Sequence, residues 1–236
     1  MKPAIKSVAE RFIAEHFPEA ELVFIGGSHV WGKPTHESDI DLVIIDENQH
    51  SSGLSCHKFE GWKIEAFRYH PSSLPIHFEA AKYKGIATLI KICADGYLLL
   101  GDSEKGEELR REAANIYEHG PSPWGEKQVD QARYLITDLL SDFQASEDPQ
   151  EDIYIVNEIL NEMTQLILRA NKEWIGWGKW NGRRLWESFP HISESLTQSY
   201  RQYFQKDDKA PFIAAVKDQL AMFGGEIFAG YKEDYL

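Results

Sequence analysis

The chain has 236 residues, of which 42% are hydrophobic and 12% aromatic, and this composition excludes an intrinsically disordered protein. Its formal net charge is −13, and the stretch from Glu126 to Glu162 holds ten acidic residues and two basic ones. This balance argues against an extended nucleic-acid surface, because phosphate backbones bind clusters of Lys and Arg. The acidic stretch suits either a cationic small molecule or an ordinary solvated helix face.

We expect neither a membrane span nor a secretory signal in this sequence. No run of about 18 apolar residues is present, so we expect no membrane span. The N-terminus lacks the uninterrupted apolar segment of a secretory signal. The two cysteines, Cys56 and Cys93, lie in unrelated contexts and are expected to be free thiols. We therefore expect a cytoplasmic protein, and the sequence indicates nothing about its oligomeric state.

The first half of the chain mixes short strands with helices. Apolar residues recur at helical spacing over 4–16, and β-branched or aromatic runs at 22–25 and 40–45 predict strands. Residues 28–33 are long enough for one or two turns of helix, and 47–55 reads as a polar loop. Further along we expect, in order, one or two strands within 57–69, helical structure over 71–92, a short strand at 96–101 and a helix over 104–117.

Strand patterns disappear after Pro121-Ser122-Pro123, which is the best candidate for a domain boundary. Apolar stripes at helical spacing then predict helices over about 129–140, 153–167, 183–189, 193–205 and 209–228. Two such helices cannot bury their apolar stripes alone, so the later helices are needed to complete a bundle. The predicted fold class is α+β, with a mixed sheet flanked by helices in residues 1–120 and a helical bundle in residues 121–236.

The stretch from Phe24 to Ile45 carries the strongest chemical signal. Asp39 and Asp41 project from the same face of the second strand, because side chains in a strand alternate between faces. Two neighbouring carboxylates repel each other unless a cation lies between them. The turn Gly26-Gly27-Ser28 can present backbone N–H groups and a hydroxyl to a phosphate. Together these features indicate metal-assisted nucleotidyl transfer.

The spacing of these residues resembles a known signature. Gly27-Ser28, ten further residues and then Asp39-x-Asp41 resemble the motif of the polymerase-beta-type nucleotidyltransferase superfamily. The intervening Gly32, Pro34 and Ser38 make the chain similar to the aminoglycoside (streptomycin and spectinomycin) adenylyltransferases and to related uncharacterised bacterial nucleotidyltransferases. The resemblance implies a nucleotidyltransferase fold with a third carboxylate on a neighbouring strand. The alternating run 62–67 supplies Glu65 in that setting.

The resemblance also implies the reaction and its cofactors. Asp39, Asp41 and Glu65 would hold two Mg²⁺ ions, while Gly27 and Ser28 would bind ATP or another NTP. Glu65 would act either as a ligand of the second ion or as the general base for the acceptor hydroxyl. An acceptor oxygen would attack the α-phosphorus in line, with pyrophosphate as the leaving group and no covalent enzyme intermediate.

The segment from Trp174 to Trp186 is the second unusual feature, with four tryptophans among glycines and basic residues. These side chains would form either a base-stacking and phosphate-binding wall or part of the bundle core with basic residues on the surface. The resemblance implies that the helical domain contributes an Arg, a Lys and a Tyr to the nucleotide. Arg169, Lys179 and Tyr203 are the matching positions.

The leading functional hypothesis is transfer of a nucleoside monophosphate, AMP from ATP by default, to a hydroxyl of a small acceptor. An aminoglycoside-type or lincosamide antibiotic is the precedent in the family. One alternative keeps the chemistry but modifies a protein side chain, and the helical domain argues against it because such enzymes are usually minimal single domains. Another alternative is a non-catalytic nucleotide-binding module, which the complete carboxylate set disfavours.

Overall fold

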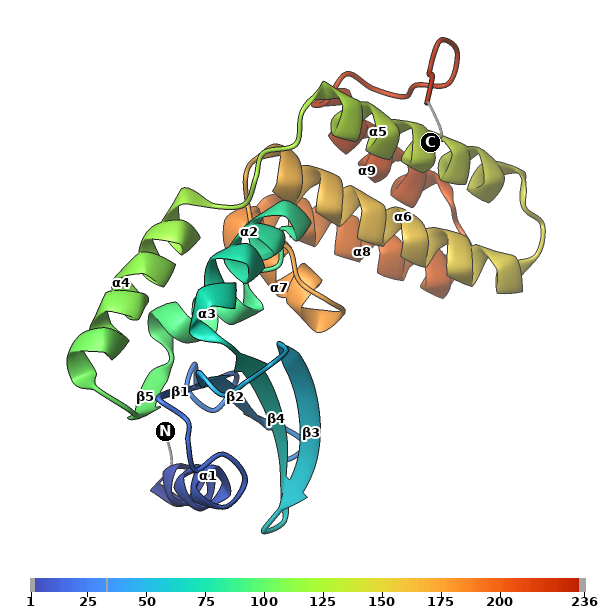
Figure 1. Cartoon of the computed structure of the whole chain (residues 1–236). Coiled ribbons are helices and arrows are strands. Elements are labelled where there is room, and N and C mark those ends of the chain that lie inside the picture. Colours follow the sequence, from blue (N-terminus) through green and yellow to red (C-terminus); the bar gives the residue numbers. More distant parts are fainter. Residues whose placement is uncertain (1–2, 33, 234–236) are drawn as a thin grey trace. The chain divides into compact units, whose positions relative to one another are not determined.

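The computed structural model describes residues 3–32 and 34–233 of the chain. It divides into two compact units, residues 1–120 and 121–236 (Figure 1). The first unit contains a five-stranded sheet in the order β3-β4-β2-β1-β5. The strands are β1 (Leu22–Gly26), β2 (Ile40–Ile45), β3 (Gly53–Phe59), β4 (Trp62–Tyr69) and β5 (Tyr97–Leu100). Pairing is parallel between β2 and β4 and antiparallel elsewhere, so the sheet is mixed.

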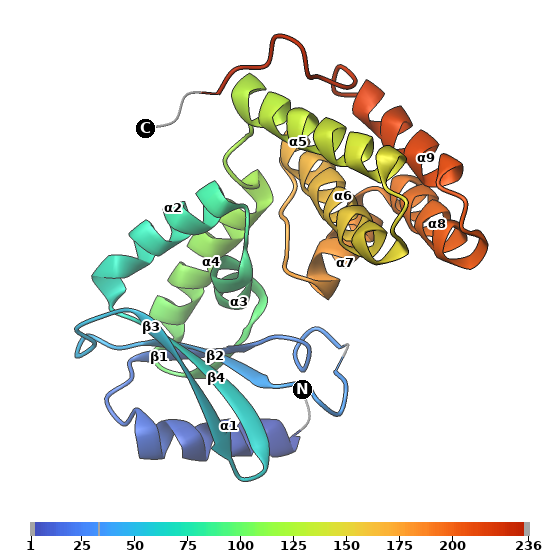
Figure 2. The same cartoon turned by 90° about the vertical axis from the view of Figure 1, so that its right-hand side faces the viewer.

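Helices cover both faces of this sheet. They are α1 (Pro3–His16), a short 3₁₀ turn (Pro71–Ser73), α2 (Leu74–Lys84), α3 (Thr88–Asp95) and α4 (Ser103–His119). Figure 2 shows α1 on one face and α2, α3 and α4 on the other. The α1 face is an apolar core in which Phe12 of α1 lies among Val23, Ile25, Ile40, Leu42, Ile44, Ile64 and Ala66 of the strands. The α+β prediction for this half of the chain is confirmed.

One predicted element in this unit is wrong, and one has a different boundary. Residues 28–32 form a turn rather than a helix, in which the amides of Val30 and Trp31 both donate to the carbonyl of Gly27. Gly27 has φ of 73°, a left-handed conformation that does not continue into a helix. The remaining residue of the expected helix, Lys33, lies outside the described residues. The predicted loop 47–55 is shorter, because β3 already begins at Gly53.

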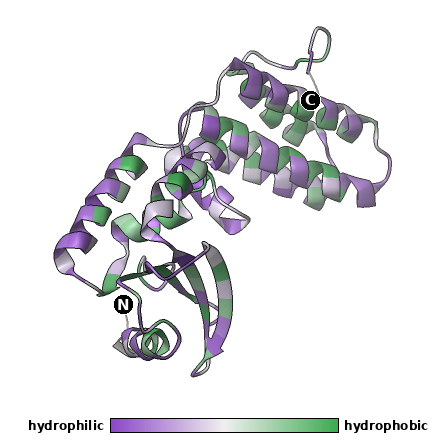
Figure 3. Cartoon of the chain, in the orientation of Figure 1, coloured by the Kyte–Doolittle hydropathy of each residue, from purple (hydrophilic) through white to green (hydrophobic). Residues whose placement is uncertain are grey.

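The second unit contains α5 (Glu126–Ala145), α6 (Pro149–Ala170), α7 (Lys179–Ser188), α8 (Pro190–Lys206) and α9 (Ala210–Ala221). Their apolar stripes meet in one core, and Figure 3 shows hydrophobic and hydrophilic positions alternating around these helices. The last helix ends earlier than predicted, because Gly224 and Gly225 both have positive φ. Among the described residues, no helix combines the length and the apolar character that crossing a membrane requires.

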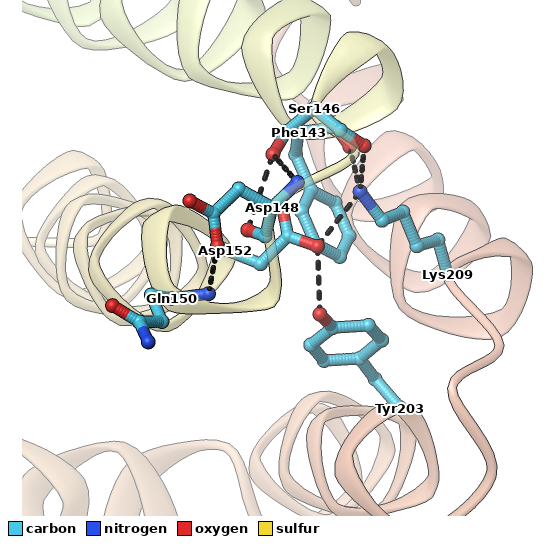
Figure 4. A network of polar contacts seen from close by, with 7 residues as sticks. All are labelled: Phe143, Ser146, Asp148, Gln150, Asp152, Tyr203 and Lys209. Carbon is cyan, nitrogen blue, oxygen red and sulfur yellow. Dashed lines mark hydrogen bonds and ion pairs between the residues drawn. The ribbon is translucent and has the colours of Figure 1, made fainter.

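A buried polar network joins four ends of these helices (Figure 4). The Lys209 ammonium donates to the carbonyls of Phe143 (2.8 Å) and Ser146 (2.7 Å), and it lies 2.8 Å from the Asp152 carboxylate. The Tyr203 hydroxyl donates to the same carboxylate oxygen at 2.7 Å. The network therefore ties the C-terminus of α5 and the N-terminus of α6 to α8 and to the start of α9.

Candidate metal site

Two strands bring the three predicted carboxylates together. Asp39 lies one residue ahead of β2, Asp41 is in β2, and Glu65 is in β4 directly beside Asp41 in the parallel register. One oxygen of each carboxylate lies within 4.8 Å of the others. Within the described ranges this is the one group of three or more His, Cys, Asp or Glu side chains with such spacing. The period of two in both strands is what places all three on the face that α3 covers.

Gly27, at the start of the turn, leaves room for the Asp41 carboxylate. A Cβ added to Gly27 would come within 1.8 Å of the Asp41 Oδ2 atom, so the carboxylate occupies the space that any side chain at position 27 would need. Gly27 also has φ of 73°, which L side chains rarely adopt. The predicted phosphate turn and the predicted metal ligand are therefore in direct contact, and Ser28 follows in the same turn, half-buried.

The charges of this site fit a divalent cation. Partial burial and the negative charge of Asp39 raise the pKa of Glu65 above its usual range. Burial makes the larger contribution to this shift, and like-charge repulsion from Asp39 adds to it. Mg²⁺ prefers oxygen ligands and commonly uses one or two carboxylates together with phosphate oxygens and water. The donor set of Asp39, Asp41 and Glu65 therefore suits Mg²⁺.

The loop that leads from Gly27 to Asp39 is tethered at its far end. The His29 ring donates from Nε2 to the carbonyl of Ser38 at 3.2 Å. Glu37 forms an ion pair with Lys63 of β4. The hydrogen bond and the charge of Glu37 raise the pKa of Lys63, and Asp39 adds to this. His29 and Lys63 have no role in the sequence-based prediction, although Lys63 lies two residues before Glu65 and therefore on the same face.

The three helical residues predicted to bind nucleotide all lie in the second unit. Arg169 is 2% exposed and donates to the carbonyl of Ser122 at 2.9 Å. Tyr203 is 3% exposed and belongs to the buried network with Asp152. Lys179 is exposed at the first residue of α7. Arg169 and Tyr203 thus have structural partners inside their own unit, and the nucleotide contacts of all three stay predictions.

The tryptophans of the 174–186 segment do not form one group. Trp174 is buried at 4% exposure, whereas Trp177 and Trp186 are exposed at 77% and 55%. The guanidinium of Arg183 lies over the Trp180 ring, 4.7 Å from its centroid. Neither a core made of four tryptophans nor a single aromatic wall describes this segment.

Comparisons with known proteins give only distant likenesses. No family model and no curated protein matches the chain. Among solved structures, a nucleotidyltransferase-like protein from Exiguobacterium sibiricum 255-15 is 11% identical with a TM-score of 0.43, over 93% of this chain and 74% of the other. A toxin-antitoxin structure with AMP-PNP is 13% identical with a TM-score of 0.33, over 48% of this chain and 87% of the other.

Proposed function

We propose that the protein is a Mg²⁺-dependent nucleotidyltransferase that moves a nucleoside monophosphate from an NTP, by default AMP from ATP, to a hydroxyl of a small acceptor. One observation carries the proposal: three carboxylates from adjacent strands lie within 4.8 Å of one another. The Asp41 member of this set fills the space beside Gly27 in the phosphate-type turn. Triphosphate and metal ligands are needed at one place for this reaction.

The site residues have separate roles in metal binding, triphosphate binding and proton transfer. Asp39, Asp41 and Glu65 would hold Mg²⁺, which when bound supplies positive charge for the triphosphate and the acceptor oxygen. The turn at Gly27 and Ser28 would orient the triphosphate through backbone N–H groups and the Ser28 hydroxyl. A new bond forms between the acceptor oxygen and the α-phosphorus, and the bond to the bridging oxygen breaks, so that pyrophosphate leaves with the electron pair. Glu65 accepts the proton of the acceptor hydroxyl or, where it completes the metal site instead, that proton passes to solvent water.

The test measures Mg²⁺-dependent pyrophosphate release and transfer of labelled nucleotide from each of the four common NTPs. Asp41→Asn removes a metal ligand and is expected to lower turnover at least about a hundredfold, since metal charge stabilisation is worth several kcal/mol. Its thermal stability should stay at or above that of the parent, because a source of like-charge repulsion is removed. Glu47→Gln removes an exposed acid elsewhere in the first unit and serves as the matched control. Full turnover by Asp41→Asn would contradict the proposal.

A further inference from the structure

The carboxylate face of the sheet continues beyond Glu65 onto the edge strand β3. In the antiparallel pairing of β3 with β4, Cys56 lies opposite Glu65 and Lys58 lies opposite Lys63. Directly opposite residues share one face of a sheet. We call the exposed group beside the carboxylates the ledge, and it consists of Leu54, Cys56 and Lys58 of β3 with Lys63 of β4.

Side chains on the two faces of β3 differ in their exposure to solvent. Leu54, Cys56 and Lys58 are all exposed, whereas the intervening residues are half-buried on the α1 side. His57, for example, packs edge-on against the Phe12 ring of α1 at 5.0 Å between centroids. The ledge is therefore the part of the carboxylate face that the helices of the first unit leave open to solvent.

The ledge is basic in a strongly acidic chain. Lys58 and Lys63 face each other across the strand pair, and like charges in that position are unfavourable. Glu37 offsets the charge of Lys63. Among the described residues Lys58 makes no ion pair, so the ledge retains one exposed ammonium group on the face of the sheet that carries the carboxylates. An anion bound there would offset the charge of Lys58.

The order of the strands separates the ledge from the phosphate turn. Gly27 follows β1, on one side of Asp41, and β3 lies on the far side of Glu65. In-line transfer needs the attacking and leaving oxygens on opposite sides of the phosphorus. If the triphosphate of the donor lies at the Gly27 turn, the acceptor approaches the carboxylates from the side of the ledge.

We propose that the ledge binds an anionic group of the acceptor, so that the acceptor is a small hydroxyl compound carrying a phosphate or a carboxylate. This inference rests on the proposed nucleotidyl transfer. It differs from the aminoglycoside precedent, because a polycation would meet Lys58 and Lys63 at the entry to the site. Lys58 would hold the anionic group through a charge-assisted contact, which its flexible stem accommodates.

The first experiment measures binding by calorimetry to the full-length protein loaded with Mg²⁺ and α,β-methylene ATP. The probes are matched pairs: glycerol and glycerol 3-phosphate, ribose and ribose 5-phosphate, glucose and glucose 6-phosphate. At least one phosphorylated member should bind more tightly than its neutral partner, and less tightly as salt rises. Lys58→Gln should weaken that binding about tenfold, the loss expected for one hydrogen bond to a charged group. Lys58→Arg should retain it.

A control variant and a measurement of affinity for the ATP analogue distinguish acceptor binding from donor binding. Lys127→Gln removes an exposed lysine of the helical unit and should change nothing. Affinity for α,β-methylene ATP should be the same in all four proteins, and a loss in Lys58→Gln would place Lys58 at the donor triphosphate and overturn the inference. Equal binding of neutral and phosphorylated members, or binding independent of Lys58, would also overturn it.

The second experiment supplies labelled ATP with the same pairs and with kanamycin as a polycationic probe. Preferential labelling of phosphorylated members, reduced about tenfold in Lys58→Gln, is the expected result. Efficient labelling of kanamycin or of the neutral sugars would refute the anionic acceptor and leave nucleotidyl transfer standing. If the parent protein neither binds the ATP analogue with Mg²⁺ nor releases pyrophosphate, the proposed function itself fails.

Discussion

Position 27 excludes a side chain for two separate reasons. Its backbone has φ of 73°, and an added Cβ would lie 1.8 Å from Asp41 Oδ2. Gly32 provides a natural comparison, because its φ is 79° but an added Cβ would meet nothing within 4 Å. The two glycines therefore have the same kind of backbone constraint, and only Gly27 adds close contact with the Asp41 carboxylate.

Gly27→Ala is expected to displace the Asp41 carboxylate and to lower pyrophosphate release about a hundredfold, the effect of a misplacement of about 1 Å. Gly32→Ala should lose only the stability that left-handed strain costs, about 1–2 kcal/mol, and should keep most of its turnover. Turnover and denaturant unfolding measured on both variants separate strain from displacement. Equal loss of turnover in the two would show that the contact with Asp41 is not the cause.

Strand periodicity predicts that the three carboxylates lie together, but it does not predict the contacts around them. Asp39, Asp41 and Glu65 follow from strand periodicity, because alternation and parallel pairing fix their common face. The Glu37–Lys63 ion pair and the bond from His29 to Ser38 depend on the path of an irregular loop, which no periodic pattern specifies. The ledge is not predicted either, because the position of Lys58 opposite Lys63 depends on the register of the β3–β4 hairpin.

At the scale of elements, the buried network of α5, α6, α8 and α9 is the feature that the apolar pattern does not reveal. Asp152 is 3% exposed and lies in the first turn of α6. Burial tends to raise its pKa, but the hydrogen bonds from Lys209 and Tyr203 outweigh burial and lower the pKa below its usual value. Because the folded pKa is lowered, this contribution to stability is present above about pH 4 and is lost as the pH falls further.

Lys209→Met is expected to destabilise the protein by about 3–5 kcal/mol at pH 7, because it leaves the Asp152 charge buried without its cation. Tyr203→Phe removes one hydrogen bond to that carboxylate and should cost about 1.5–3 kcal/mol. The control is Lys217→Met, whose exposed ion pair with Glu226 should be worth less than about 1 kcal/mol. Urea unfolding at pH 7 and pH 3 measures all three. A Lys209→Met effect as small as that of Lys217→Met, or one that persists undiminished at pH 3, would contradict this account.

Some helix ends can be predicted from local sequence signals alone. Asp148 accepts the amide of Gln150 and Pro149 takes the first position of α6, so this helix starts at a recognisable cap. Gly85, with φ of 75°, ends α2 and divides the helical stretch predicted over 71–92 into two helices. Residues 28–32 do not form the expected helix, because Gly27 has φ of 73° and the chain turns there, and the close approach of Asp41 that favours glycine at this position is not visible in a local window.

At the scale of the whole molecule, each unit has a core of its own. The core between α1 and the sheet is formed by residues between Ile5 and Ala66. The bundle core is formed by residues between Ala132 and Leu220. The division of the chain at Gly120 and Pro121 coincides with the loss of strand patterns in the sequence. A unit with its own core can fold alone.

Residues 121–236 expressed alone are expected to give a helical circular dichroism spectrum and one cooperative unfolding transition. Lys209→Met in this fragment should lower its stability by the same amount as in the full chain, since the network lies wholly within it. Thermal and urea unfolding provide the measurement. A fragment that unfolds without cooperativity would show that the bundle depends on the first unit.

Binding of Mn²⁺, a paramagnetic substitute for Mg²⁺, tests the central claim most directly. Electron paramagnetic resonance of the full-length protein with α,β-methylene ATP should show bound Mn²⁺, with affinity lost in Asp39→Asn and Asp41→Asn and weakened in Glu65→Gln. Glu47→Gln should bind Mn²⁺ as the parent does. Unchanged Mn²⁺ affinity in the Asp39→Asn and Asp41→Asn variants, with their fold intact, would show that these carboxylates are not a metal site and would contradict the account.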